Sequence, residues 1–331
     1  MRLTRILTGV ALLGTALAAL TACQSPSAPT EATKLTIGLT YQPDIQFAPI
    51  YVAAEEGYFH DAGLDITIRH HGASESLFGA MQTGVEDVVF AGGDEMMQAR
   101  SQGVDVVNIA TIYQQYPAAV LVPSDSPIQT AADLKGHSIG LPGEYGQNWF
   151  ALLLILQQAG LSASDVTVVS IGYTQQAALM GGKVDAVVGF VNNDQVRFEQ
   201  AGFPVRAITL QSGLVGAGLG VSPALLGSNQ PALQAMWGAI AKAMQVCIDD
   251  PAKALADAAK YVPGLDQADN AAMASATLKA TTLLYPGPDG GFGTQNVATW
   301  AAMADFMAGA GLLSGPVTPT DAYTTTIVGQ R

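Results

Sequence analysis

Hydrophobic and polar positions in the first third of the chain predict short strands that alternate with helices. "KLTIGLTY" (34–41) and "DITIRH" (65–70) alternate in polarity as strands do, and "DVVFAG" (87–92) has the apolar character of a buried strand. Phe47, Ile50, Ala54 and Tyr58 recur at helical spacing after the first strand, which predicts a helix packed on the sheet. Strands that alternate with helices form parallel sheets, so we predict an α/β fold with a mainly parallel sheet.

The same alternation continues to the end of the first lobe and begins again near residue 118. Further elements are predicted in this order: helices near 74–82 and over 94–103, a strand within 104–114, strands from 118 and within 136–141, a helix over 147–159, a strand over 166–172, a helix over 173–183, a strand over 184–190, a helix over 192–202, and a strand over 204–210. The chain then forms alanine-rich helices near 230–248, 251–261, 268–283 and 295–310.

The two series predict two α/β lobes, with the chain crossing near 114–118 and returning near 208–216. The C-terminal helices are expected to pack on the first lobe. The predicted division is a signal peptide over 1–22, a flexible tether over 23–34, the first part of lobe 1 over 35–115, lobe 2 over 116–208, and the return to lobe 1 with its C-terminal helices over 209–331.

The start of the chain has the pattern of an export signal. Arg2 and Arg5 precede the apolar run "ILTGVALLGTALAAL", which is too short to form a stable membrane-spanning helix. The small residues before Cys23 resemble the lipobox of bacterial lipoproteins. That resemblance implies cleavage before Cys23 and a lipid on its sulfur, which would anchor the protein at the outer face of the cell membrane. Ordinary signal cleavage beside an incidental cysteine is the alternative.

Charge and cysteine content narrow the classes of partner. The chain has 14 Lys and Arg against 27 Asp and Glu, a formal charge of −13, which disfavours nucleic acid and anionic lipid surfaces as partners. Only two cysteines are present. With Cys23 assigned to lipid, a disulfide framework is excluded, and Cys247 is predicted to be a buried free thiol on a helix.

Candidate binding residues follow the predicted strands, because ligands bind outside the carboxyl ends of strands in α/β sheets. Amides, carboxylates and rings in this set suit a flat heteroaromatic ligand, whose face stacks on rings and whose edge pairs with polar groups. Asp94 and Asn192 are equally suited to capping helices, and Phe47 to core packing. The predicted ligand-binding residues are Asp44, Gln46, Phe47, Tyr51, Gly93, Asp94, Glu95, Tyr113, Tyr145, Gly146, Asn148, Trp149, Asn192 and Asn193.

Several of these stretches carry a family resemblance. "QFAPIYVAAEEGYFHDAGLDITI", "ADLKGHSIGLPG" and "MGGKVDAVVGF" resemble signature stretches of periplasmic-type solute-binding proteins of ABC importers, over roughly residues 35–310. The branch that binds thiamine-pyrimidine precursors, riboflavin and sulfonates is the most similar. "QPDIQFAP", "GGDEMMQARSQG" and "LPGEYGQNWFALL" favour its riboflavin and pyrimidine-precursor binders.

This resemblance implies a two-lobed, type II-like binding fold that closes on a small solute and delivers it to a permease and its ATPase. It implies a monomer without a cofactor or catalytic residues.

A sulfonate or taurine-type ligand is the main alternative. Six basic side chains fall outside the predicted strand ends, and an anion usually recruits an arginine fork. Helix N-termini also bind anions, which keeps this alternative open. The six basic residues are Arg69, Arg100, Lys135, Lys183, Arg197 and Arg206.

Enzymatic and structural alternatives have weaker sequence support. "GHSIG" (136–140) matches a hydrolase pattern at Ser138, but it lacks the strand-to-helix context of a nucleophile elbow. A pyrimidine-synthesising enzyme of the same fold is expected to carry a cysteine-rich motif, which is absent here. A purely adhesive lipoprotein would not need glycine-rich loops after its strands.

Two further motifs are given structural interpretations. The four histidines show no metal-ligand spacing with cysteines, and "RHH" (69–71) is interpreted as a solvated strand edge, with metal binding by chance as the alternative. "GAGLG" (216–220) lacks the context of a dinucleotide loop and is interpreted as a flexible return segment.

Overall fold

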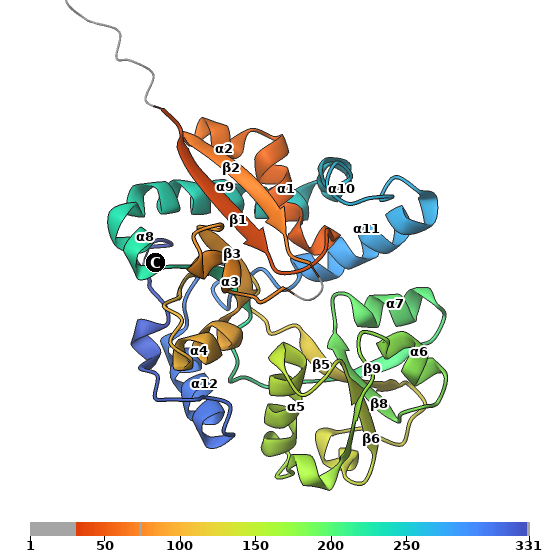
Figure 1. Ribbon diagram of the computed structural model, residues 1–331. Helices are drawn as coiled ribbons and strands as arrows, with labels where there is room; N and C mark the ends of the chain where they lie inside the picture. The colour runs from red at the N-terminus through yellow and green to blue at the C-terminus, as the bar shows by residue number, and fades with distance from the viewer. Residues whose placement is uncertain (1–30, 73–74, 330–331) are drawn as a thin grey trace, which may run out of the picture. The chain divides into compact units, whose positions relative to one another are not determined.

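Two five-stranded sheets organise the part of the chain that the structure describes, residues 31–72 and 75–329 of a computed structural model (Figure 1). The first sheet has the order β2-β1-β3-β10-β4 and consists of β1 (Thr33–Leu39), β2 (Leu64–His70), β3 (Val88–Gly92), β4 (Val107–Thr111) and β10 (Ala217–Val221). The second has the order β7-β6-β8-β5-β9 and consists of β5 (Ala118–Pro123), β6 (Ser138–Leu141), β7 (Thr167–Ser170), β8 (Ala186–Phe190) and β9 (Val205–Thr209).

One strand in each sheet runs against the others. β10 is antiparallel to β3 and β4, and β5 is antiparallel to β8 and β9, while the remaining strands of each sheet share one direction. The reversed strands are the first ones that the chain enters after each crossing. β4 ends at the carboxyl edge of the first sheet. The chain then enters the second sheet at its carboxyl edge, so β5 is antiparallel to the strands beside it. The same holds for β9 and β10, so both crossings join the carboxyl edges of the sheets.

The interpretation of "GAGLG" as a flexible return segment was wrong, because these residues overlap β10, a buried strand between β3 and β4. A β-carbon on Gly218 would lie 2.4 Å from the carbonyl oxygen of Ala110, and one on Gly220 would lie 2.7 Å from a side-chain carbon of Val106. Glycine therefore lets this strand pass between its neighbours at close range. The same glycines remove the alternating pattern by which a strand is recognised.

The helices agree closely with the predicted ranges, especially in the C-terminal third. The α-helices are α1 (Ala48–Glu55), α2 (Tyr58–Asp61), α3 (Gly79–Gln82), α4 (Gly93–Ser101), α5 (Gly146–Gln158), α6 (Gln175–Met180), α7 (Asp194–Gln200), α8 (Pro223–Ser228), α9 (Gln230–Asp249), α10 (Pro251–Ala258), α11 (Ala268–Thr282) and α12 (Val297–Gly309). Short 3-10 turns are η1 (Ile45–Phe47), η2 (Ala131–Leu134), η3 (Ala163–Asp165) and η4 (Pro319–Asp321). The helix predicted near 74–82 is shorter than expected, because only 79–82 are helical among residues 75–82, and α8 was not predicted.

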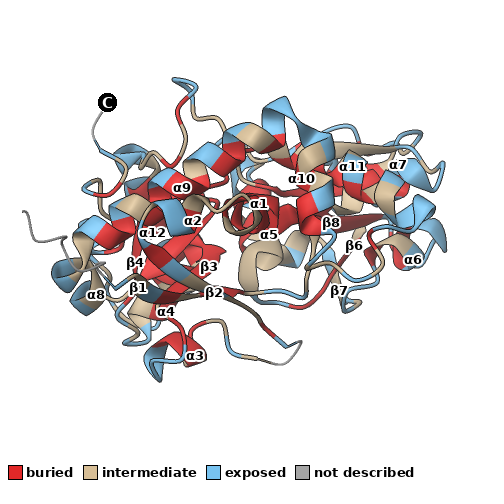
Figure 2. Ribbon diagram, turned by 90° about the horizontal axis from the view of Figure 1, so that it is seen from above, coloured by how far each residue is buried: buried red, intermediate tan, exposed pale blue. Residues whose placement is uncertain are grey.

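The C-terminal helices close the core of the first sheet, as predicted. Leu233 and Ile240 of α9 share a buried cluster with Ile37 of β1 and Ile50 of α1, and Figure 2 shows these elements mostly in the colour of buried residues. Cys247 of α9 belongs to the same cluster and is 1% exposed, which confirms the predicted buried thiol. Burial raises the pKa of this thiol to about 12.

Helix α12 behaves differently from the other C-terminal helices. Its Trp300 and Met303 form one buried cluster with Met97 of α4 and with Phe150 and Leu154 of α5. The α4 helix follows β3 of the first sheet and α5 follows β6 of the second. One apolar cluster therefore holds together two helices that start at the carboxyl ends of strands in different sheets.

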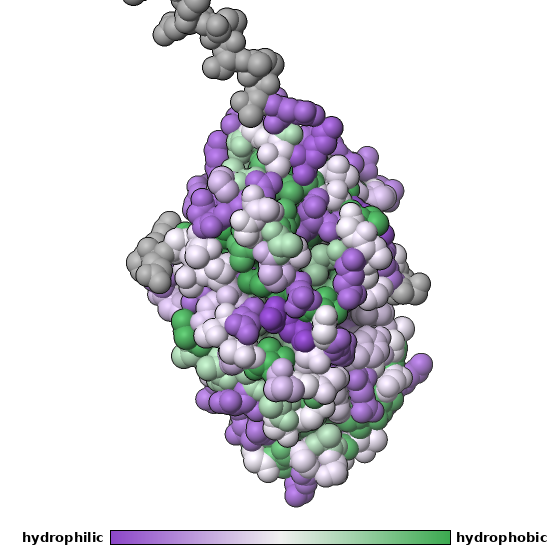
Figure 3. Space-filling model, turned by 60° about the vertical axis from the view of Figure 1, so that its left-hand side comes forward, coloured by the Kyte–Doolittle hydropathy of each residue, from purple (hydrophilic) through white to green (hydrophobic). Residues whose placement is uncertain are grey.

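The surface of the described residues is mixed in polarity. On the face in Figure 3, hydrophilic and hydrophobic residues are interspersed. No helix of residues 31–72 and 75–329 is apolar over a length that would cross a membrane. The predicted signal peptide and Cys23 lie outside the described residues.

Candidate functional site

The first turns of α4 and α5 face each other across the two sheets. A β-carbon on Gly92 would lie 2.8 Å from Nε2 of Gln147, and one on Gly146 would lie 3.3 Å from Oε1 of Glu95. Gly146 has φ +64°, a conformation that favours glycine, and it begins α5 directly after the loop from β6. Two helix N-termini, each following a buried strand, therefore contact one another.

Two carboxyl groups, those of buried Asp94 and partly buried Glu95, occupy this contact. Oδ1 of Asp94 accepts from the backbone N–H of Glu95 at 2.8 Å, and Oε2 of Glu95 accepts from the backbone N–H of Gly92 at 2.9 Å. The Asp94 residue is 0% exposed, and burial, with the neighbouring Glu95 charge, raises the pKa of its carboxyl group to about 8. Burial also raises the pKa of Glu95. Asp94 thus lies in the first turn as predicted, with a carboxyl group that is hard to ionise.

Tyr116 joins these carboxyl groups to the second sheet. Its hydroxyl lies 2.5 Å from Oδ2 of Asp94 and 3.0 Å from the carbonyl oxygen of Gln147, and it sits between β4 and β5 where the chain crosses. One hydroxyl proton satisfies only one of two acceptors. Both contacts are hydrogen bonds when Asp94 is protonated and donates to the Tyr116 oxygen while Tyr116 donates to Gln147. The raised pKa of Asp94 agrees with that arrangement.

Polar atoms of α5 remain without partners beside this network. Nε2 of Gln147 and Oδ1 of Asn148 are buried and make no hydrogen bond within residues 31–72 and 75–329. Leaving such an atom unpaired costs about 1–3 kcal/mol. One amide donor and one amide acceptor are thus held in the first turn of α5, where Gln147 meets α4.

A second polar contact joins the carboxyl ends of β1 and β8. Asp44 caps η1 by accepting from the backbone N–H of Gln46 at 3.0 Å and from its Nε2 at 3.1 Å. Nδ2 of Asn192 donates to Oε1 of Gln46 at 3.1 Å and to Oγ1 of Thr281 at 3.0 Å, and the Tyr113 hydroxyl donates to the backbone oxygen of Gln46 at 3.2 Å. Asp44, Gln46, Tyr113 and Asn192 are therefore brought together, with Asn192 bridging between the sheets rather than capping α7.

Two of the predicted aromatic residues belong to the core of the first sheet. Phe47 is 5% exposed and packs edge-on against Phe90, and Tyr51 is 0% exposed and stacks on Tyr261. The Tyr51 hydroxyl lies 2.7 Å from Nε2 of His70. Neither ring is presented at the α4–α5 contact.

The remaining predicted residues lie around α5 and α7. Trp149 is half-buried and packs against apolar clusters on both sides of α5, while Tyr145 is 57% exposed. Gly93 is buried against Val215. Oδ1 of Asn193 accepts from Nε of Arg197 at 2.7 Å, so a cation of α7 lies beside a predicted site residue.

Two exposed tyrosines were missing from the predicted set. Tyr41 follows β1 and is 39% exposed, and Tyr173 follows β7 and is 69% exposed. Partial loss of hydration raises the pKa of Tyr173 to about 12, and Tyr145, Tyr41 and Glu95 all add to the shift. Their position directly after a predicted strand was the signal that could have identified them.

One hollow on the surface of the described residues lies elsewhere. It is formed by α5, α12 and the segment before β10, and its lining residues are Leu154, Gln157, Gln158, Ser212, Gly213, Ala302, Asp305 and Phe306. None of these is a predicted site residue, so the candidate site rests on the polar contacts above and not on a cavity.

The structure can be compared with the sequence interpretations of His71 and Ser138. His71 is 5% exposed and bonded to Glu86, so the interpretation of "RHH" as a solvated edge was wrong for this residue. Ser138 lies within β6, and its hydroxyl donates to Asp185 at 2.7 Å. It therefore does not occupy a strand-to-helix elbow, in agreement with the sequence context.

The chain belongs to the family described as NMT1/THI5 like, which matches residues 44–254. Among its relatives is the riboflavin-binding protein RibY of Chloroflexus aurantiacus, 31% identical over 322 residues that cover 94% of this chain and 90% of the relative. A formylaminopyrimidine-binding protein of Halalkalibacterium halodurans is 23% identical over 92% of this chain and 94% of its own length.

The fold is that of periplasmic binding proteins. The crystal structure of the periplasmic aliphatic sulphonate binding protein SsuA from Escherichia coli aligns with a TM-score of 0.70 at 19% identity, over 87% of this chain and 91% of that one. The family match and this alignment confirm the resemblance and the two-sheet fold predicted from the sequence.

Enzymes also occur among the relatives. A 4-amino-5-hydroxymethyl-2-methylpyrimidine phosphate synthase of Saccharomyces cerevisiae is 28% identical over 168 residues, half of this chain and 49% of the enzyme. The relatives from Chloroflexus aurantiacus and Halalkalibacterium halodurans match over 90% and 94% of their own length, and both are named as binding proteins.

Proposed function

We propose that this chain is the solute-binding component of an ABC import system. It captures a small heteroaromatic vitamin-type solute, a pyrimidine precursor of thiamine or riboflavin, between its two lobes and delivers it to a permease. Support comes from the full-length relatives that are named for riboflavin and formylaminopyrimidine. Both chain crossings connect the carboxyl edges of the two sheets, which supports a binding site between the lobes.

The contact between the first turns of α4 and α5 carries this proposal. Gln147 Nε2 offers an unpaired donor and Asn148 Oδ1 an unpaired acceptor, both buried. A pyrimidine or isoalloxazine edge presents N–H, ring nitrogen and carbonyl groups in one plane, which is the complement of such a pair. Ligand binding would replace the missing hydrogen bonds, so these two atoms favour the bound state.

Exposed tyrosines supply the stacking surface in this proposal. Tyr145, Tyr41 and Tyr173 follow strands of both sheets and are all partly exposed to solvent. Offset stacking on an aromatic ring adds about 0.5–1.5 kcal/mol beyond the buried area. We assign the remaining predicted residues Gly93, Asp94, Glu95, Gly146 and Trp149 to the walls of the same site, and Asp44, Gln46, Tyr113, Asn192 and Asn193 to a second polar edge. Phe47 and Tyr51 support that edge from the core.

A sulfonate-type solute is the second candidate. Two helix N-termini that face each other favour an anion, and Arg197 lies beside Asn193. The carboxyl groups of Asp94 and Glu95 in the same first turn oppose it, because either group would repel a bound anion whenever it is ionised. A heteroaromatic solute with N–H donors meets no such opposition.

We assign a transport role rather than catalysis, with no catalytic residue and no cofactor. The chain is proposed to be exported, cleaved before Cys23, and held as a monomer at the outer face of the membrane by a lipid on that cysteine. The permease and its ATPase are its partners. Loss of the protein from the membrane fraction in Cys23→Ala tests the anchor, and retention there would contradict it.

A thermal-shift panel tests the ligand class. The protein is heated with riboflavin, with 4-amino-5-hydroxymethyl-2-methylpyrimidine, with taurine and with an alkanesulfonate, each over a range of concentrations. A ligand at about 100 times its Kd stabilises the folded state by about 2.7 kcal/mol. We expect a concentration-dependent rise in Tm with one of the two heteroaromatic compounds. A rise with taurine or the alkanesulfonate alone would establish the second candidate instead, and turnover of any compound would contradict the transport role.

A further inference from the structure

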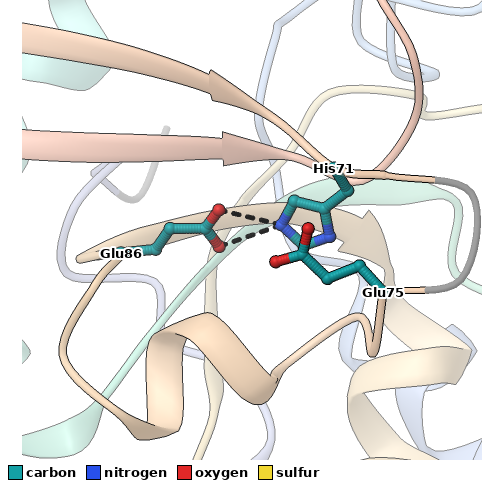
Figure 4. Close-up of side chains that lie close together, drawn as sticks. All are labelled: His71, Glu75 and Glu86. Carbon is teal, nitrogen blue, oxygen red and sulfur yellow. Dashed lines mark hydrogen bonds and ion pairs between the residues drawn. The ribbon is translucent and has the colours of Figure 1, made fainter.

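Three side chains of metal-binding type lie together after β2, away from the predicted ligand site. One nitrogen of His71 and one carboxylate oxygen each of Glu75 and Glu86 all lie within 4.8 Å of one another (Figure 4). His71 follows the last residue of β2, and Glu86 precedes β3. Figure 4 shows the Glu86 carboxylate bonded to one nitrogen of the imidazole and the Glu75 carboxylate drawn against the same ring.

The Glu86 carboxylate is placed by its surroundings. A β-carbon on Gly38 of β1 would lie 2.1 Å from this carboxylate, so the glycine leaves the space that the group occupies. The Glu86 side chain is 0% exposed, and its Oε1 lies 2.6 Å from Nη1 of Arg69. Nη2 of the same Arg69 lies 2.5 Å from Oε1 of Glu75.

This arrangement fixes the tautomer of His71. Nε2 lies 2.9 and 3.0 Å from the two oxygens of Glu86. Both Glu86 oxygens face this nitrogen, and Oε1 also accepts from Arg69, so Nε2 is the donor to the carboxylate and Nδ1 is the nitrogen left for another partner. Nδ1 is buried and has no hydrogen-bond partner in residues 31–72 and 75–329. A carboxylate that orients a histidine through one nitrogen and leaves the other free is the usual outer shell of a metal-binding histidine.

We propose that this cluster binds a divalent transition-metal ion of the Zn²⁺ type. His71 Nδ1 and the Glu75 carboxylate are its ligands, water completes the coordination, and Glu86 orients the histidine. Imidazole nitrogen and carboxylate oxygen suit this class of ion. The Glu75 side chain is 25% exposed, which provides an entry from solvent. Arg69 holds the same carboxylate and competes with the ion, so metal binding replaces the Arg69–Glu75 pair.

Titration of the purified protein with Zn²⁺ against a chromophoric chelator tests the proposal. His71→Ala and Glu75→Gln should each weaken Zn²⁺ binding by at least about tenfold, since even outer-shell changes cost 10–100-fold. Arg69→Gln should tighten binding, because it removes the competing cation. His60→Ala is the matched control, since that side chain is 90% exposed and outside the cluster, and its affinity should equal that of the wild type.

The contrary results are equally specific. The proposal is overturned if the wild type binds Zn²⁺ no more tightly than His71→Ala, or if Glu75→Gln retains wild-type affinity. Glu75 is partly exposed, so Glu75→Gln is expected to fold. It therefore tests the proposal even if His71→Ala fails to fold. The proposal does not depend on the solute, and the titration is done without one.

Discussion

Buried carboxyl groups in two regions of the first sheet have opposite surroundings. Glu86 is enclosed before β3, where Arg69 and His71 both bond to its oxygens. Asp94 and Glu95 are enclosed just after the same strand, and within residues 31–72 and 75–329 neither forms an ion pair. Strand β3 thus has a neutralised carboxylate at its start and two carboxyl groups without a cation at its end.

This difference separates stabilising groups from binding groups. A buried carboxylate with a cation and hydrogen bonds is satisfied by the fold itself. Asp94 and Glu95 are satisfied only in part, by backbone N–H groups and by the Tyr116 hydroxyl. Folding alone gives little reason to bury them together at two helix N-termini, so we assign them to the solute site.

Replacing Glu86 by alanine is expected to lower the free energy of unfolding more than the other substitutions. Glu86→Ala leaves Nη1 of partly exposed Arg69 and Nε2 of buried His71 without this acceptor, and removing one partner of a buried pair costs about 3–5 kcal/mol. Urea unfolding measures this loss. Asp87→Ala, which removes the neighbouring carboxylate and one backbone hydrogen bond, is the matched control and should cost about 1 kcal/mol. Equal losses in the two variants would contradict the comparison.

The pH dependence of stability should identify Asp94. Its folded pKa is raised to about 8 from an ordinary value near 3.8, so the folded state holds a proton that the unfolded state releases. The contribution is fully present below about pH 4 and is lost as the pH rises towards 8. Asp94→Asn should flatten the free energy of unfolding between these limits, where each pKa unit is worth about 1.4 kcal/mol. An unchanged pH profile would show that Asp94 is ionised in the folded protein.

Gln147→Ala is expected to separate binding from folding. Its buried Nε2 has no partner within the described ranges, so truncation should leave the free energy of unfolding nearly unchanged while solute affinity falls by about tenfold, the value of one hydrogen bond. Gln245→Ala, on the exposed surface of α9, should change neither quantity. A large loss of stability in Gln147→Ala would assign that side chain to the fold.

The smallest expected change in the free energy of unfolding is that of Glu75→Gln. Hydrogen bonding to Arg69 lowers the pKa of this carboxyl group, so its contribution is present above its ordinary pKa and is lost as the pH falls, opposite in sign to Asp94. Ion pairs that are open to solvent contribute little to stability, because water and salt screen them. Glu75→Gln should therefore lower the free energy of unfolding at pH 7 only slightly. A loss comparable to that of Glu86→Ala would remove the distinction between them.

The regular elements could be predicted from the sequence because their patterns are local. Helices α9 to α12 and most strands follow from the spacing of apolar residues. Strand β10 could not be predicted, because its glycines carry no side-chain pattern and its pairing with β3 and β4 is made across the chain. The burial of His71 was missed for a similar reason, since it depends on space above Gly38 and on Glu86, 15 residues away.

The candidate site could be predicted as a region but not as a network. Asp94, Gly146 and Asn148 could be predicted because they follow strand ends, and ligands bind outside the carboxyl ends of parallel strands. The hydrogen bond from Tyr116 to Asp94 links residues of a crossing segment and a helix, and no local pattern signals it. The outward exposure of Tyr41 and the inward packing of Tyr51 differ by tertiary packing alone.

Isothermal titration of the wild type and of Gln147→Ala with the heteroaromatic compound that raises Tm is the most direct test of the solute site at the α4–α5 contact. We predict a one-to-one complex for the wild type and an affinity about tenfold weaker for the variant. Identical affinities in the two proteins, or no heat of binding in the wild type with either heteroaromatic compound, would contradict the account.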